Sequence, residues 1–227
     1  MVRIILSLKD RSYQPKPARR EYIAKKNSSK KRPLGIQSGD DKLVQEVVKM
    51  ILESIYEPVF SNKSHGFRPN RSAENAIAQV YKMIQTQHLY YVVDVDIKSF
   101  FDNVSHGKLL KQMWTMGIQD KQLLKIISLM LKAEVAGIGF PEKGTPQGGI
   151  ISPLLSNIVL NELDWWVASQ WETLPTRKIY KGKELKTRTV DRSSTYRALR
   201  ESNLKECYIV RYADDFKIFC RKRSDAV

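Results

Sequence analysis

The sequence predicts an α+β fold. Apolar residues recur at helical spacing in several segments, whereas two other segments are rich in the β-branched and aromatic residues that favour strands. The chain has no internal repeat, and its 227 residues suffice for one large domain or two small ones with a buried core. Its two cysteines exclude a disulfide scaffold and favour a reducing cytoplasm.

The helices are predicted by apolar spacing together with residues that start or stop a helix. A stripe of valine, leucine and isoleucine follows Asp40, which is expected near the cap, and ends before Pro58. Ser72 is expected to cap the next helix. Pro153 follows the glycine-rich segment Lys143–Gly149. Because proline is favourable in the first turn of a helix, another helix is predicted to begin there. The expected helices begin at Asp40 and Ser72, cover 109–116 and 123–131, and begin again at Pro153.

The strands are predicted at Tyr90–Ile97 and within Cys207–Cys220. The second segment has two β-rich runs around a polar centre, so it predicts a hairpin that turns at Ala213-Asp214. The two cysteines are symmetric about this turn and are expected to be cross-strand neighbours. Residues 172–206 show little periodicity and are expected to form a loop or an insertion.

The net charge of +15 lies mainly in two segments. Residues 1–33 carry +9 and residues 176–205 carry +7, which leaves the remainder near neutral. Basic segments on a neutral body favour a polyanionic partner, nucleic acid first. The alternative is a solubility surface or a basic tail, and charge alone does not decide between them.

The apolar segments do not predict a membrane protein. The sequence has no run of 18 apolar residues, which a spanning helix needs. The N-terminus has a short apolar patch without a small-residue cleavage site, so a secretory signal is not expected.

Acidic residues occur where strands are predicted. Asp94 and Asp96 alternate with apolar residues and therefore share one face of their strand. Asp214 and Asp215 lie at the hairpin turn. Each pair also has a simpler interpretation, a solvated strand face for the first and a polar turn for the second.

Taken together, the carboxylates favour a cation site. Carboxylates on adjacent strands would hold hard cations, since Mg²⁺ prefers oxygen ligands. Two such ions about 4 Å apart stabilise the attacking and leaving oxygens of a phosphoryl displacement. A basic protein with such a pocket is a candidate nucleotidyltransferase, although a nuclease would fit the same description.

Several motifs in order resemble reverse transcriptases, and bacterial group II intron-encoded ones in particular. The hairpin segment Tyr212–Asp215 resembles the YxDD signature of reverse transcriptases. The segments Asp96–Val104 and Gly144–Pro153 resemble the first and second palm motifs of that family. The segments Lys31–Gly35 and Ser64–Ser72 resemble the group II intron-encoded members in particular.

The resemblance implies a right-hand polymerase with fingers, an antiparallel palm sheet and packed helices. Fingers with the basic N-terminal segment would cover residues 1–90, and the palm 91–227 with a basic insertion at about 172–206. By the same resemblance, Asp96 and Asp214 would bind two Mg²⁺ ions, or Mn²⁺ in their place. Asp215 would complete the acidic cluster, and the backbone carbonyl of Ile97 would also face a metal.

The resemblance also assigns residues to the incoming dNTP. Phe101 matches the aromatic steric gate against a 2′-hydroxyl, with the alternative that Phe100 or Phe101 belongs to the core. Gln147 matches a residue that touches the nucleotide. Lys25 and Arg32 match the pair that holds the triphosphate. Three other residues remain rivals to Lys25: Lys26, Lys30 and Lys31.

The expected partners are an RNA template, the intron RNA, a DNA or RNA primer and dNTP. The family implies a bacterial cytoplasmic location in a ribonucleoprotein, without a membrane. The basic segments and the loop that follows the fingers supply the expected nucleic-acid contacts: Arg68, Arg71, Lys178, Lys181 and Arg188.

The chain departs from the family pattern at its C-terminal end. Family members continue into a thumb and a maturase region, often followed by an endonuclease, and these regions are not expected in a sequence that runs seven residues past Cys220. A truncated fragment with weak or no processive synthesis is therefore expected. The alternative function is a non-catalytic module that binds intron RNA or self-associates, with a homodimer formed through exposed apolar surface.

Overall fold

The structure is a computed structural model that describes residues 2–24, 31–180 and 191–227. It divides into two compact units. Unit 1 comprises residues 1–60 and 97–160, and unit 2 comprises residues 61–96 and 161–227. The boundary between fingers and palm near residue 90 stays a prediction.

Unit 1 is mainly helical, with one two-stranded antiparallel sheet in which Arg19 lies opposite Ile36. Helices α5 and α6 pack on each other. Its elements are α1 (Val2–Lys9), β1 (Arg19–Ala24), β2 (Lys31–Ile36), α2 (Gly39–Tyr56), α4 (Phe100–Asn103), α5 (His106–Thr115), α6 (Lys121–Leu131) and the first half of α7 (Ser152–Gln170).

Helix α2 shows why the apolar spacing predicted its position. The Ser38 side chain accepts a hydrogen bond from the Asp41 backbone N–H and caps the helix two residues before the expected Asp40. Its buried face includes Val48, Leu52 and Tyr56, and the Tyr56 hydroxyl donates to the backbone carbonyl of Met113 in α5. The helix ends at Tyr56, ahead of Pro58, as predicted.

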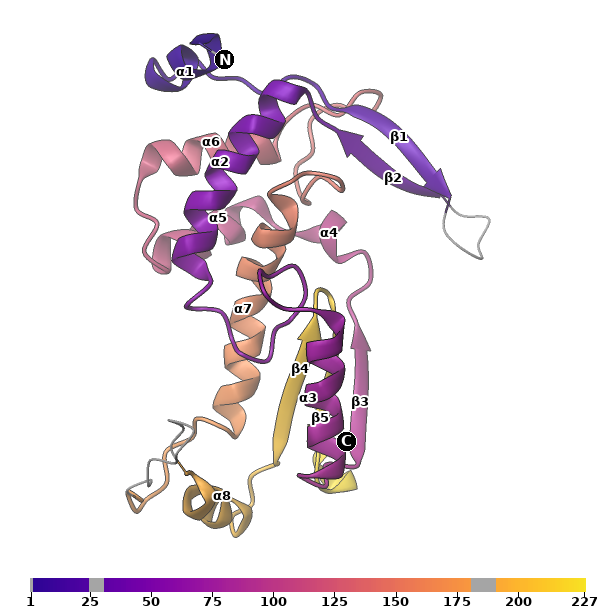
Figure 1. The fold of residues 1–227 in the computed structure, drawn as a ribbon, viewed down its shortest axis with the longest axis vertical. Helices are drawn as coiled ribbons and strands as arrows, with labels where there is room; N and C mark the ends of the chain where they lie inside the picture. Colours follow the sequence, from indigo (N-terminus) through magenta and orange to yellow (C-terminus); the bar gives the residue numbers. More distant parts are fainter. Residues whose placement is uncertain (1, 25–30, 181–190) are drawn as a thin grey trace. The chain divides into compact units, whose positions relative to one another are not determined.

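Unit 2 is built on a three-stranded antiparallel sheet in the order β3-β5-β4. Helix α3 begins with a capping box formed by Ser72 and Asn75, and it packs against β4 (Figure 1). The elements of this unit are α3 (Ala73–Gln85), β3 (Tyr91–Asp96), the second half of α7, α8 (Ser193–Arg200), β4 (Cys207–Tyr212), β5 (Asp215–Cys220) and the 3₁₀ turn Arg223–Asp225.

The core of unit 2 combines aromatic and aliphatic side chains. Phe219, Trp171 and Leu89 are fully buried in one cluster, and the Trp171 indole N–H donates to the Tyr208 hydroxyl at 3.0 Å. This bond satisfies the only polar hydrogen of the buried indole. The sheet and the residue that directly follows α7 are thereby joined within unit 2.

The predicted hairpin is confirmed, with Tyr212 opposite Asp215 and Cys207 opposite Cys220. The expectation for residues 172–206 is corrected, since they are not all loop and α8 lies within them.

The described residues include no helix with the length and hydropathy needed to span a membrane.

Candidate functional site

An acidic cluster lies at the end of the unit 2 sheet where β3 ends and the β4–β5 hairpin turns. Asp96, the last residue of β3, is the cross-strand partner of Asp215, the first residue of β5. Asp214 occupies the turn just before Asp215 and is half-buried, whereas Asp96 and Asp215 are exposed. The sheet register therefore places Asp96 beside Asp215 at one end of the sheet, with Asp214 in the adjacent turn.

One lysine lies on the same face of this sheet. Lys217 is the cross-strand partner of Asp94, and its Nζ donates to an Asp94 carboxylate oxygen at 2.6 Å. The same Nζ lies 3.7 Å from a carboxylate oxygen of Asp215. The Asp94 carboxylate holds the pKa of Lys217 above its usual value, and Asp215 adds to that effect. Asp94 thus supports the cluster through Lys217.

The turn that carries Asp214 is held tightly by its neighbours. Ala213 is 7% exposed and has a φ of 58°, which places it in the left-handed region. A Cβ at Gly66 would lie 2.2 Å from the backbone nitrogen of Ala213, so only glycine allows this approach of the 61–71 loop. The loop and the turn are therefore packed backbone to backbone.

The acidic cluster offers carboxylate oxygens, the ligand atoms that a hard divalent cation prefers. Like charges directly opposite each other in a sheet are destabilising, and Asp96 and Asp215 are such a pair. Mg²⁺ commonly takes one or two carboxylates together with phosphate oxygens. Within the described residues, no three His, Cys, Asp or Glu side chains are gathered closely enough to hold a metal ion unaided. Substrate oxygens would therefore have to complete the coordination.

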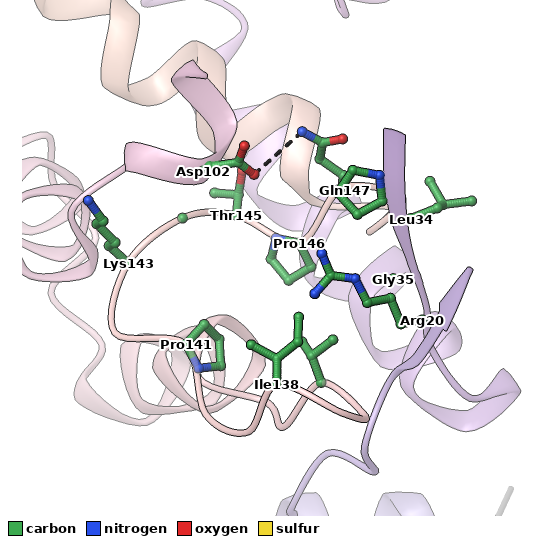
Figure 2. Close-up of a pocket in the computed structure, with 13 residues that line it drawn as sticks. Arg20, Leu34, Gly35, Asp102, Ile138, Pro141, Lys143, Thr145, Pro146 and Gln147 are labelled. Atoms are coloured by element: carbon green, nitrogen blue, oxygen red, sulfur yellow. Dashed lines mark hydrogen bonds between the residues drawn. The ribbon is translucent and has the colours of Figure 1, made fainter. Parts of the chain in front are cut away.

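Unit 1 has a separate cavity of 190 Å³ between the β1–β2 hairpin and the 135–147 loop (Figure 2). We call it the hairpin cavity. Its walls are apolar, with basic side chains at Arg20 and Lys143. The remaining lining comes from Pro33, Leu34, Gly35, Asp102, Val135, Ile138, Pro141, Gly144, Thr145, Pro146 and Gln147.

Polar atoms of the hairpin cavity are left without protein partners. Gln147 donates through Nε2 to Asp102 at 3.5 Å, as Figure 2 shows, while its Oε1 is buried with no hydrogen bond. Thr145 Oγ1 and Arg20 Nε are also buried and unpaired among the described residues. Unpaired buried polar groups are costly, so these three atoms distinguish the hairpin cavity from an ordinary apolar cavity.

The loop that carries Gln147 is tied to the segment that carries Phe101. The Gly144 N–H donates to the Val104 carbonyl, and the Thr145 N–H donates to the Phe101 carbonyl, both at 2.7 Å. Phe100 is 8% exposed and belongs to the core, while Phe101 is half-buried with its ring edge-on to Phe100. The expectation that one of the two phenylalanines is a core residue is confirmed.

Other predicted residues are distributed as follows. Arg32 lies in β2 opposite Ile23, and Ile97 directly follows β3. Lys178 is exposed, with its ammonium 5.7 Å from the Tyr180 ring centroid. Arg71 donates to the backbone and side-chain oxygens of Asn62. Three predicted residues lie outside the described residues: Lys25, Lys181 and Arg188.

The expectation for Arg68 requires a correction. Its side chain is buried, with 6% of the residue exposed, and Nη1 donates to the carbonyls of Ser61 and Ser64. Arg68 therefore closes its own loop, which argues against direct contact with nucleic acid.

Sequence reasoning missed a buried ion pair beside the turn. Arg211 donates to both carboxylate oxygens of Asp164 in α7, and both side chains are fully buried. An arginine between apolar strand residues was the available signal, because arginine is almost never fully buried unless it is paired. Arg20 and Asp102 of the hairpin cavity carried no comparable signal.

Residues 23–227 match the family described as reverse transcriptase (RNA-dependent DNA polymerase). The chain belongs to the reverse transcriptase family. It is 49% identical to the group II intron-encoded protein LtrA of Lactococcus lactis over 173 residues, 73% of this chain and 28% of LtrA. It is 36% identical to the protein YkfC of Escherichia coli over 92% of this chain and 55% of YkfC. The resemblance to group II intron-encoded reverse transcriptases is confirmed.

Solved structures support the fold. Telomerase from Candida albicans, in complex with a fragment of telomeric RNA, aligns over 96% of this chain and 40% of its own, with a TM-score of 0.54 and 11% identity. Apo telomerase from Candida tropicalis aligns with a TM-score of 0.55 and 10% identity over 93% of this chain and 40% of its own. The predicted right-hand polymerase fold is confirmed.

Family members generally use divalent metals. The chain spans 28% of LtrA and 55% of YkfC.

Proposed function

We propose that this chain catalyses RNA-directed DNA synthesis, in which a primer 3′-hydroxyl attacks the α-phosphate of a dNTP. The observation that carries the proposal is the pairing of Asp96 with Asp215 beside the Asp214 turn, in a chain of the reverse transcriptase family. A cluster of carboxylates at a strand end is the arrangement that nucleotidyl transfer needs.

The carboxylates would hold two Mg²⁺ ions, or Mn²⁺ in their place. Asp96 and Asp214 are the proposed main ligands, with Asp215 and the carbonyl of Ile97 in support. When bound, the ions would make the 3′-hydroxyl more acidic and neutralise phosphate charge. Lys217 offsets part of the negative charge of the cluster through its contacts with Asp94 and Asp215.

The nucleotide would be bound and selected by residues of unit 1. Lys25 and Arg32 are proposed to hold the triphosphate, since cations form strong hydrogen bonds to phosphate. Gln147 is proposed to contact the nucleotide, which its unpaired Oε1 supports. Phe101 is proposed to exclude a 2′-hydroxyl.

RNA template, intron RNA and a DNA or RNA primer are the proposed nucleic-acid partners, in a bacterial cytoplasmic ribonucleoprotein. Arg71, Lys178, Lys181 and Arg188 are the proposed contacts. If phosphate contacts dominate, log affinity should fall linearly with log salt concentration. Neutralising Lys178, Lys181 and Arg188 together should make that slope shallower.

Single-nucleotide incorporation tests the proposal without requiring processivity. The chain, in excess over a primer annealed to an RNA template, should add one dNTP in the presence of Mg²⁺. Asp214→Asn should abolish the addition, because it removes a proposed metal ligand. Glu201→Gln, which neutralises an exposed acid of the same unit, should not.

The outcomes separate the two functions. Incorporation that survives Asp96→Asn and Asp214→Asn would refute the mechanism. RNA binding without any incorporation would instead favour the non-catalytic RNA-binding module. The homodimer is tested by sedimentation at high protein concentration, where a monomer would refute it.

A further inference from the structure

We propose that Arg211 and Asp164 are positioning residues that set the direction of the Asp214 carboxylate by fixing the peptide unit before it. The inference rests on the proposed function and assigns a task to an ion pair that no catalytic step uses. Both residues, and the turn they act on, lie in unit 2.

The ion pair is closed and bidentate. Arg211 Nε donates to Asp164 Oδ1 at 2.8 Å, and Nη2 donates to Oδ2 at 2.7 Å, with both side chains 0% exposed. Taking two charges out of water is expensive, and apolar residues of similar volume often stabilise a core equally well. Stability alone therefore does not account for an arginine at this place.

The remaining arm of the guanidinium reaches the turn. Arg211 Nη1 donates to the backbone carbonyl of Ala213 at 2.7 Å. That carbonyl belongs to the same planar peptide unit as the nitrogen of Asp214. Holding the oxygen consequently holds the plane from which the Asp214 side chain departs.

The turn requires such a hold. Ala213 has a φ of 58°, a conformation that few residues with a Cβ adopt. Since Asp164 fixes two of the guanidinium nitrogens, the third cannot swing away from Ala213. Asp164 thus acts on Asp214 through Arg211, and an apolar replacement would fill the space without supplying the donor.

The backbone of Arg211 is anchored as well. Its N–H donates to the Lys63 carbonyl and its carbonyl accepts from the His65 N–H, both at 2.9 Å. Gly66 then approaches the nitrogen of Ala213. Arg211 is the residue at which the 61–71 loop, α7 and the turn meet within unit 2.

The test uses an apolar replacement of the whole pair. Arg211→Met combined with Asp164→Leu removes both charges together, so no unpaired charge remains in the core, and the double variant should fold. Mn²⁺ affinity in the presence of dNTP and a primer–template whose primer lacks a 3′-hydroxyl, measured by electron paramagnetic resonance, should fall about 10- to 100-fold, as when groups that orient metal ligands are removed. Amide exchange of residues 211–215 should accelerate, and kcat should fall while KM for dNTP stays within about twofold.

Glu206→Gln is the matched control. Glu206 is 3% exposed, accepts hydrogen bonds from Arg200 and Arg221, and precedes β4 at the end of the hairpin away from the turn. It should lower stability yet leave Mn²⁺ affinity and exchange at residues 211–215 unchanged. Equal effects of the control and the double variant on these two measurements would reduce the Arg211–Asp164 pair to a structural role.

Failure of the inference is distinguishable from failure of the proposed function. A folded double variant with wild-type exchange at residues 211–215 would overturn the inference, whatever the wild type catalyses. A wild-type chain that neither binds Mn²⁺ nor incorporates dNTP would refute the proposed function instead, and the exchange measurement would still decide whether the pair holds the turn.

Discussion

Asp96 and Asp215 lie directly opposite each other across β3 and β5, so that two carboxylates face each other in the sheet register. Without a cation this pair opposes the pairing of the two strands. A ligand that binds only the folded state stabilises it in proportion to the logarithm of its concentration over its Kd.

We therefore expect Mg²⁺, added together with dNTP whose phosphate oxygens complete the coordination, to raise the melting temperature of the chain relative to dNTP in EDTA. Asp215→Asn should melt higher than wild type in EDTA, because the repulsion is removed, and should respond less to Mg²⁺. Thermal denaturation followed by circular dichroism measures both effects. An equal Mg²⁺ response in wild type and variant would contradict the cation site.

Lys217 should control how strongly the sheet depends on cations. Exposed ion pairs such as Lys217–Asp94 contribute only about 0–1 kcal/mol, so Lys217→Met should cost little in Mg²⁺. In EDTA the loss should be larger, since Asp94, Asp96 and Asp215 then share one face without a compensating charge. The measurement is the difference in melting temperature with and without Mg²⁺. Lys222→Met, at an exposed lysine beyond β5, should leave that difference unchanged.

We expect the free energy of unfolding to fall at acid pH because of His65. Burial lowers the pKa of His65 below its ordinary value, and although the hydrogen bond with Gln79 raises it, nearby arginine and lysine charges lower it further. The unfolded chain therefore binds a proton at a higher pH than the folded chain does. Stability should be fully present above the unfolded pKa, near 6.5, and should fall as the pH drops from there through the folded value.

Urea unfolding at several pH values between 7.5 and 5 measures this step. His65→Asn should be less stable at pH 7.5 but should show a flatter pH profile. His88→Asn is the control, because His88 is exposed and has a positive φ that asparagine tolerates. An unchanged profile in His65→Asn would exclude His65 as the source.

Phe101→Ala should weaken discrimination against ribonucleotides. Phe101 is half-buried at the start of α4, and removing its ring would remove the proposed clash with a 2′-hydroxyl. The ratio of rNTP to dNTP incorporation should rise by about 10- to 100-fold. Phe100→Leu alters the neighbouring core ring and should lower stability without changing that ratio. Unaltered discrimination in Phe101→Ala would remove Phe101 from nucleotide selection.

Local patterns predicted the parts of the fold in which local chemistry decides the structure. Helix α3 begins at Ser72 because the serine and Asn75 cap each other, and both lie within one turn. The β4–β5 hairpin was recognisable because its two runs and the turn at Ala213 are adjacent in the sequence. The pattern also placed Asp96 on a strand and Asp214 and Asp215 at the turn, whereas the pairing of β3 with β5 that aligns Asp96 with Asp215 comes from the structure.

Long-range pairing explains what the patterns missed. In β2, Pro33 is opposite Tyr22, and proline is tolerated in this two-stranded sheet because an edge strand leaves one side of its backbone unpaired. Polar, proline-containing sequence therefore gave no strand signal. Arg68 shows the same limit, since its charge suggested nucleic acid while the fold directs it to two carbonyls of its own loop.

Gly66→Ala should damage unit 2 more than a methyl group usually would. The added Cβ would lie 2.2 Å from the backbone nitrogen and 3.0 Å from the Cα of Ala213, and neither is a flexible side-chain end. The loop or the turn must shift, at a cost of about 1–3 kcal/mol, as for other overpacked sites. Gly107→Ala is the matched control, since a Cβ there meets nothing within 4 Å and alanine favours helix α5. Urea unfolding should show a lower free energy of unfolding for Gly66→Ala and an unchanged one for Gly107→Ala.

Because the shift moves the turn before Asp214, nucleotide incorporation by Gly66→Ala should also fall under conditions where the protein remains folded. Wild-type incorporation by a folded Gly66→Ala variant would show that the turn tolerates displacement.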